Sequence, residues 1–350
     1  GSCTNSSYRD LMMVAAMLKG RRVHENTTLA IAPGSRQVLE MLSRNGALAD
    51  IIAAGARILE AGCGACIGQG QSPADGTVTV RTFNRNFAGR TGTKGDQAYL
   101  VSPEVAAAAA LKGSFIEPAE LDIPCPEIAE AEKFLVNDDM IIPPPPASAK
   151  VEIIRKPTIG KPPVNPALPE TLDGTVVIKV GDKITTDHIM PAGIHLKHRS
   201  NIPAYSKVVF ECFTEKGKPS FAERAAAVRD SGKHGVIVGR DSYGQGSSRE
   251  HAAICPMFLG VKAVIAFAIE RIHAANLVNF GIVPLLFADK SDYEKIEQGD
   301  SLVIPAIRKQ LAVGNPVCAE LKGAKITLAH NLSAEDIAII LAGGRLNYKD

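Results

Sequence analysis

The chain has 350 residues, of which 45% are hydrophobic and 22% are charged, which is typical of a soluble globular protein of about two domains. Its net charge of +2, its 5% aromatic content and its lack of Trp argue against nucleic-acid and membrane-surface partners. No apolar run reaches the roughly 18–20 residues of a membrane-spanning helix. Seven irregularly spaced cysteines argue against a disulfide framework and favour a reducing compartment, so we expect a cytoplasmic protein.

The first half of the chain alternates short apolar runs with helical patterns. Helices are expected at 7–18, 36–43, 48–53 and 103–111, and strands at 29–32, 57–59, 78–82 and 99–101. This alternation predicts a layered α/β domain with a mostly parallel sheet, which we place at 1–137. The chain opens on Gly-Ser-Cys-Thr-Asn without a Met, so we expect this domain to be truncated at its N-terminal side.

Residues 138–170 are rich in proline and include a run of four, Pro143–Pro146. Proline removes backbone donors and favours extended backbone, so this stretch is expected to be a semi-rigid linker between domains. A second, smaller α/β domain is expected at 171–350. Its strands are expected at 175–180, 236–238, 263–267, 283–287 and 326–329, and its helices at 221–228, 250–258, 268–277 and 334–342.

Two cysteines, Cys63 and Cys66, flank a Gly-Ala pair and could face one metal or cluster. A zinc ribbon needs a second such pair, and a thioredoxin-type redox pair has no other support. Cys3 lies just before an expected helix, where the helix N-terminus favours a thiolate. Three thiolates would leave one iron of a cubane cluster open as a Lewis acid, whereas four would suit electron transfer. The other four cysteines are expected to pack as small buried hydrophobes.

Two further motifs carry charged or titratable side chains. Asn84, Arg85 and Arg90 occupy a glycine-containing stretch, where planar guanidinium groups could bind carboxylates or form surface salt bridges. Asp187 and His188 follow two threonines, and this pair fits either an acid–base network or a turn cap with a satisfied histidine.

The last motif runs from Tyr243 to His251 and contains two glycines before Ser247, Ser248 and Arg249. The glycines permit a sharp turn, and the serines are expected to open a helix whose free N–H groups favour an anion. A simple N-cap serine is the alternative, since neither the dinucleotide fingerprint nor the Walker pattern is present. A serine beside an arginine and a helix N-terminus could exist as an alkoxide.

Taken in order with Cys3, these motifs resemble the aconitase superfamily over nearly the whole chain. The resemblance implies that Cys3, Cys63 and Cys66 hold a [4Fe–4S] cluster, and that Ser247 is the general base. It places Asp187 and His188 in the active-site network on a mobile C-terminal domain. The substrate-binding residues that it implies are Asn84, Arg85, Arg90, Arg199, Ser248 and Arg249.

The implied activity is aconitate hydratase, which isomerises citrate and isocitrate through cis-aconitate. Arg199 lies 12 residues after Asp187, a spacing that resembles the aconitase arginine for the terminal carboxylate and favours citrate over isopropylmalate. Homocitrate or methylcitrate substrates, an RNA-binding apo form and an electron-transfer cluster protein are the alternatives.

The chain departs from the family pattern in two ways. Met190 stands where many family members carry Ser. The family's first two domains are missing, so this chain alone is expected to have an incomplete site.

Overall fold

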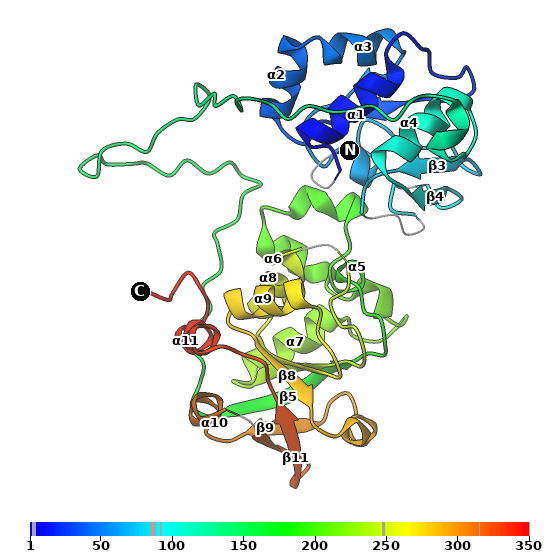
Figure 1. Ribbon diagram of the computed structural model, residues 1–350. Helices are drawn as coiled ribbons and strands as arrows, with labels where there is room; N and C mark the ends of the chain where they lie inside the picture. The colour runs from blue at the N-terminus through cyan, green and yellow to red at the C-terminus, as the bar shows by residue number, and fades with distance from the viewer. Residues whose placement is uncertain (2–4, 85–88, 92, 247–248, 315, 350) are drawn as a thin grey trace. The chain divides into compact units, whose positions relative to one another are not determined.

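The structure is a computed structural model (Figure 1) that describes residues 1, 5–84, 89–91, 93–246, 249–314 and 316–349. The chain divides into two compact units, Gly1–Val151 and Glu152–Asp350. Cys3, Arg85, Ser247 and Ser248 lie outside the described residues. No described helix is long and apolar enough to cross a membrane.

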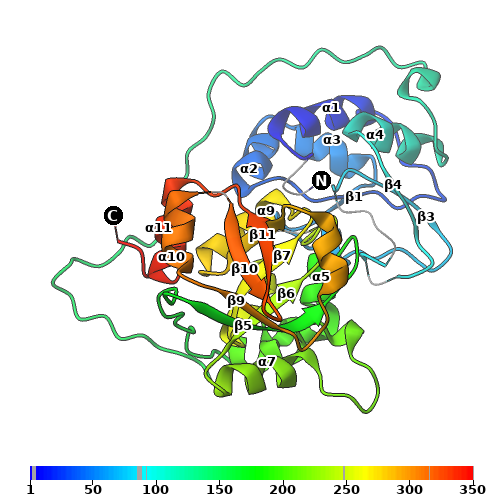
Figure 2. The same ribbon diagram turned by 90° about the horizontal axis from the view of Figure 1, so that it is seen from below.

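The first unit packs helices against two short pairs of parallel strands. Its helices are α1 (Tyr8–Leu18), α2 (Arg36–Arg44), α3 (Ala47–Ala53) and α4 (Pro103–Lys112), and its strands are β1 (Ala30–Ile31), β2 (Arg57–Ile58), β3 (Val78–Arg81) and β4 (Gln97–Leu100). Helix α1 contacts both α3 and α4, and Figure 2 shows these helices grouped together. Leu18, Leu42, Ile51 and Ala108 are almost fully buried in their shared core.

Local chemistry sets where these helices begin. Ser7 caps α1 in a reciprocal capping box with Asp10, which satisfies two backbone N–H groups that the helix leaves unpaired. Ser102 caps α4, where Pro103 occupies the first turn and its missing N–H costs nothing. The expected helices of this half therefore lie within one residue of their observed starts.

Between the short 3₁₀ turn Pro118–Leu121 and β5 (Leu172–Lys179) the described chain contains no helix or strand. The division between the two units falls within this stretch. Several apolar side chains in it are strongly exposed, including Val136 (81%) and Ile142 (91%). The linker boundaries of 138–170 remain a prediction that proteolysis can test.

The second unit is built on a closed barrel with the strand order β10-β11-β8-β7-β6-β5-β9. Strands β5 to β8 pair in parallel, whereas β9, β10 and β11 join them by antiparallel pairing. The strands other than β5 are β6 (His234–Val238), β7 (Val261–Ala266), β8 (Val283–Phe287), β9 (Ser301–Ile304), β10 (Val317–Leu321) and β11 (Ala324–Ala329).

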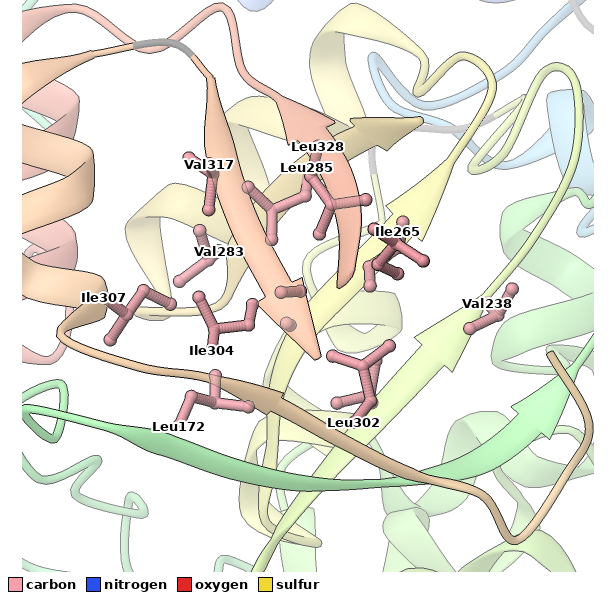
Figure 3. Packing of buried hydrophobic residues seen from close by; sticks show 14 of the residues in the cluster. Leu172, Val238, Ile265, Val283, Leu285, Leu302, Ile304, Ile307, Val317 and Leu328 are labelled. Carbon is pink, nitrogen blue, oxygen red and sulfur yellow. The ribbon is translucent and has the colours of Figure 1, made fainter. Parts of the chain in front are cut away.

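Alternate residues of these strands face two different cores, as the two-residue period of a strand requires. On β7, Ala263 and Ile265 join the barrel interior, whereas Val264 and Ala266 pack with the surrounding helices. Figure 3 shows Leu172, Val283, Leu302 and Val317 converging inside the barrel, together with other aliphatic side chains.

Helices surround the barrel: α5 (Thr186–Ile189), α6 (Ile202–Tyr205), α7 (Phe221–Asp230), α8 (His251–Phe258), α9 (Arg271–Asn279), α10 (Ile307–Val313) and α11 (Ala334–Ala342). The predicted α/β class is confirmed. Five elements of this unit were not predicted: the helices α5, α6 and α10 and the strands β9 and β10. The second unit, expected to be the smaller, is the larger one in this chain.

Candidate functional site

In the first unit, the stretch from Thr82 to Thr91 contacts both cysteine-bearing segments. The Gly1 amino group donates to the Thr82 hydroxyl, and Asn5 donates to the Thr82 carbonyl oxygen at 3.0 Å. Ser6 adds a 2.7 Å hydrogen bond to the carbonyl oxygen of Ala32. These bonds hold the described residues on either side of the Cys3 position beside Thr82, and Asn84 follows as an exposed residue.

The other end of this stretch contacts the turn that carries Cys66. Arg90 Nε donates to the Cys66 carbonyl oxygen at 3.0 Å, and Arg90 Nη2 lies 3.6 Å from Cys66 Sγ. Cys66 is buried and Cys63 is exposed. Gly68 ends this 3₁₀ turn at φ +80, and a Cβ there would lie 2.1 Å from the Thr91 carbonyl oxygen, so only glycine fits. A guanidinium group beside the sulfur suits an anionic thiolate.

A buried ion pair flanks the stretch from Thr82 to Thr91 in the chain. Arg81 and Asp96 are bonded at 2.8 Å, and their side chains are 4% and 3% exposed. Asp96 also accepts from Thr79 at 2.5 Å and from Thr91 at 3.4 Å. These bonds join β3 and Thr91 to Asp96, the residue just before β4.

In the second unit, the two remaining motifs pair through their backbones. Thr186 N–H donates to the Gln245 carbonyl oxygen at 2.8 Å, and Gly244 N–H donates to that of Ile184 at 2.7 Å. Arg249 Nη1 lies 2.8 Å from an Asp187 carboxylate oxygen. The fold thus brings together an aspartate and an arginine that are 62 residues apart in the chain.

Arg249 also donates to the Met190 carbonyl oxygen at 2.5 Å. The Met190 side chain is fully buried in the core between the barrel and the helices. Where the sequence has Met190 instead of serine, the side chain therefore packs in the core, and the contact with Arg249 is made by the Met190 backbone carbonyl.

His188 takes part in the cap of the short helix α5. Its Nδ1 accepts from Thr185 N–H at 3.1 Å, while Thr185 Oγ1 accepts from His188 N–H at 3.1 Å. In the neutral imidazole the proton is therefore on Nε2. The ring is exposed and meets Phe213 edge-on at 6.0 Å. The turn-cap arrangement that the sequence left open is thus present.

Helix α8 begins at His251 with Glu250 as its N-cap residue. The prediction that the serine pair opens a helix falls on Ser247 and Ser248, which lie outside the described residues.

The expectation about the remaining cysteines was wrong in part. Cys255 is buried, and burial raises the pKa of its thiol to about 12, but Cys125, Cys212 and Cys318 are exposed.

Two histidines were not assigned a role from the sequence: His251, the last residue of this motif, and His273 on α9. His251 Nε2 lies 2.8 Å from the Arg199 carbonyl oxygen. His273 packs under Gly244, where a Cβ would lie 2.3 Å from the imidazole. His273 is 2% exposed and neither ring nitrogen has a hydrogen-bond partner among the described residues, and burial lowers its pKa to about 4. Only the spatial contact identifies either residue, since neither histidine is near its partner in the chain.

Two models of known protein families match this chain. The model described as "Aconitase family (aconitate hydratase)" matches residues 1–113, and the model of the aconitase C-terminal domain matches residues 183–290. The chain belongs to the aconitase family. These two matches cover the cysteine and arginine motifs in the first unit and the Asp187 and Ser247 motifs in the second.

Curated relatives within the aconitase family match 99% of this chain. The mitochondrial aconitate hydratases of Gracilaria gracilis and Saccharomyces cerevisiae are 32% and 31% identical, and 50% of each is covered. The mitochondrial homocitrate dehydratase of S. cerevisiae is 29% identical, with 51% covered. The chain thus spans about half the length of these relatives. Their names overturn the expected cytoplasmic location, because they are mitochondrial proteins.

A solved 3-isopropylmalate dehydratase from Methanocaldococcus jannaschii is 25% identical to this chain. The match covers 51% of this chain and 91% of that one, with a TM-score of 0.38. That score is too low to support a detailed comparison of the two structures.

The cysteines agree in chemistry with an iron–sulfur cluster, since thiolates are the usual ligands. Two of the three aconitase-type cysteines, Cys63 and Cys66, are described, and Arg90 lies beside Cys66. Among the described residues no group of three or more His, Cys, Asp or Glu side chains could hold a metal ion. Cys3 is outside that set.

Proposed function

We propose that this chain forms part of an aconitate hydratase that isomerises citrate and isocitrate through cis-aconitate. The contact of Arg90 with Cys66 is the observation that carries this proposal. It joins a cation suited to a substrate carboxylate with a thiol suited to a cluster. The relatives named aconitate hydratase support the same reaction.

Cys3, Cys63 and Cys66 would hold the [4Fe–4S] cluster. When bound, a cluster with an open iron supplies a Lewis acid for the departing hydroxyl group. In the first unit, Asn84, Arg85 and Arg90 would bind substrate carboxylates. The hydrogen bonds of Thr82 and Thr91 would keep this loop in place while substrate is bound.

In the second unit, Ser247 would remove the proton from the substrate carbon as general base, and return it during rehydration. Ser248 and Arg249 would bind substrate. Asp187 would orient Arg249 through their 2.8 Å ion pair, and the Nε2–H of His188 would be available as a hydrogen-bond donor.

Arg199 would bind the terminal carboxylate of citrate. Its side chain is exposed, and its guanidinium group has no ion-pair or hydrogen-bond partner in the described part of the chain. A homocitrate substrate is the second candidate, because one relative is named homocitrate dehydratase and one added carbon keeps the terminal carboxylate.

The test begins with reconstitution of the chain with iron and sulfide without oxygen. We expect a broad visible absorbance that Cys63→Ser abolishes and that Cys318→Ser, a change at another exposed cysteine, leaves intact. Equal loss in both variants would contradict the ligand assignment. In the full-length protein, rates with citrate and homocitrate would then be compared, and a preference for homocitrate would select the second candidate.

A further inference from the structure

The segment that ends at Arg199 is held by two buried rings. The Tyr205 hydroxyl donates to the Pro191 carbonyl oxygen at 2.9 Å. His251 Nε2 lies 2.8 Å from the Arg199 carbonyl oxygen. A carbonyl oxygen only accepts, so His251 must carry a proton on Nε2 to make this bond. The two side chains therefore fix both ends of the nine-residue segment from Pro191 to Arg199.

The two rings also support each other. Tyr205 is fully buried and His251 is 8% exposed, and their ring centroids are 5.2 Å apart. Burial holds each ring in one orientation, because a packed interior leaves few alternative rotamers. The hydrogen bond from His251 is therefore directed at one place in the backbone.

The bond fixes the backbone of Arg199 and leaves its side chain exposed. His251 is the first residue of α8 and lies two positions after Arg249, which binds Asp187 and the Met190 carbonyl oxygen. One short stretch of chain thus sets the position of both arginines that we assign to the substrate.

We propose that His251 is a positioning residue for Arg199, and that it sets the distance between the Arg199 and Arg249 guanidinium groups. This distance would determine how far apart two carboxylates of a substrate can be if both guanidinium groups are to bind them. The inference rests on the proposed function for its substrate, but the positioning itself is a property of the second unit alone.

Hydrogen exchange of the chain tests the positioning without substrate. The amides of Arg199 and Asn201 bond to the carbonyl oxygens of Leu196 and His198. His251→Leu removes the donor to the Arg199 carbonyl oxygen, and we expect these two amides to exchange about fivefold faster, as the loss of one hydrogen bond of about 1 kcal/mol implies. His251→Gln should restore most of the protection, because its amide N–H can donate to the same carbonyl.

His198→Leu is the matched control, because it makes the same change next to Arg199 without removing a side-chain hydrogen bond described in the structure. Exchange of the β7 amides in each variant reports whether the barrel stays folded. If His251→Leu leaves Arg199 and Asn201 as protected as in the wild type while β7 is intact, the proposal is overturned.

Kinetics of the full-length protein test the consequence for substrate. We expect His251→Leu to raise the KM for citrate about tenfold with little change in kcat, and His251→Gln to reverse this. In an Arg199→Lys background, His251→Leu should raise the KM no further, since both substitutions act through the contact of residue 199 with the substrate carboxylate. Additive effects would overturn the proposal. If Arg199→Lys alone leaves citrate unaffected, the assignment of Arg199 to substrate fails, whereas the exchange result still decides the positioning.

Discussion

At the scale of single residues, Ser247 is the side chain on which the proposed proton transfer depends. In the full-length protein, Ser247→Ala should lower turnover by roughly 10²–10⁴-fold, the usual loss for a positioned acid or base. The KM for citrate should change little, because the hydroxyl acts mainly in the transition state. Steady-state kinetics measure both constants. A rise in KM with unchanged turnover would instead make Ser247 a binding residue.

Arg199 should respond differently, because its proposed role is recognition. Arg199→Lys replaces a planar fork with a point charge, so two-pronged binding of a carboxylate is lost. We expect weaker apparent affinity for citrate and a smaller effect on a substrate that is apolar at that end, such as isopropylmalate. Equal losses for both substrates would show that Arg199 acts structurally and would remove the main support for citrate.

At the scale of elements, His273 links α9 to the glycine turn before Ser247. Its pKa is about 4 in the folded chain against 6.5 for an ordinary histidine, because burial disfavours the charged imidazole. Between these values the unfolded chain binds a proton that the folded chain does not. Titration of His273 therefore does not reduce the free energy of unfolding above about pH 6.5. As the pH drops toward 4, it lowers that free energy by about 3 kcal/mol in total.

His273→Leu removes this titration. From pH 7 to pH 5 the free energy of unfolding of the second unit should therefore fall by about 2 kcal/mol less in the variant than in the wild type. Urea unfolding followed by far-UV circular dichroism at both pH values measures this difference. Identical pH dependence in the two proteins would show that His273 is accessible to protons in the folded state.

At the scale of the whole molecule, the proline-rich stretch should be cut first by proteases. It has no regular structure between 122 and 171 and exposes many side chains, so its backbone adapts easily to a protease site. Limited proteolysis with mass spectrometry should give stable fragments that end near Asp138 and begin near Thr171. A first cut within 105–111, inside α4, would contradict the two-domain interpretation.

Local signals in the sequence were enough to predict several elements. Capping serines and proline placed α1 and α4, and continuous apolar runs indicated β6, β7 and β8. The motif order also identified the family, because each motif is a contiguous stretch. Strands β9 and β10 were missed: β9 has only four residues, and β10 lacks a continuous apolar run because exposed Cys318 and Glu320 alternate with buried residues.

Which distant residues meet depends on how the whole unit packs. Barrel closure requires β9 to pair with β10 and also with β5, which lies more than a hundred residues away in the chain. No local pattern encodes a pairing over that separation. The contacts of Arg90 with Cys66, Arg249 with Asp187, and His251 with Arg199 arise in the same way. Sequence patterns specify which face of an element is buried, whereas the choice of partner depends on long-range packing that forms only when the whole unit folds.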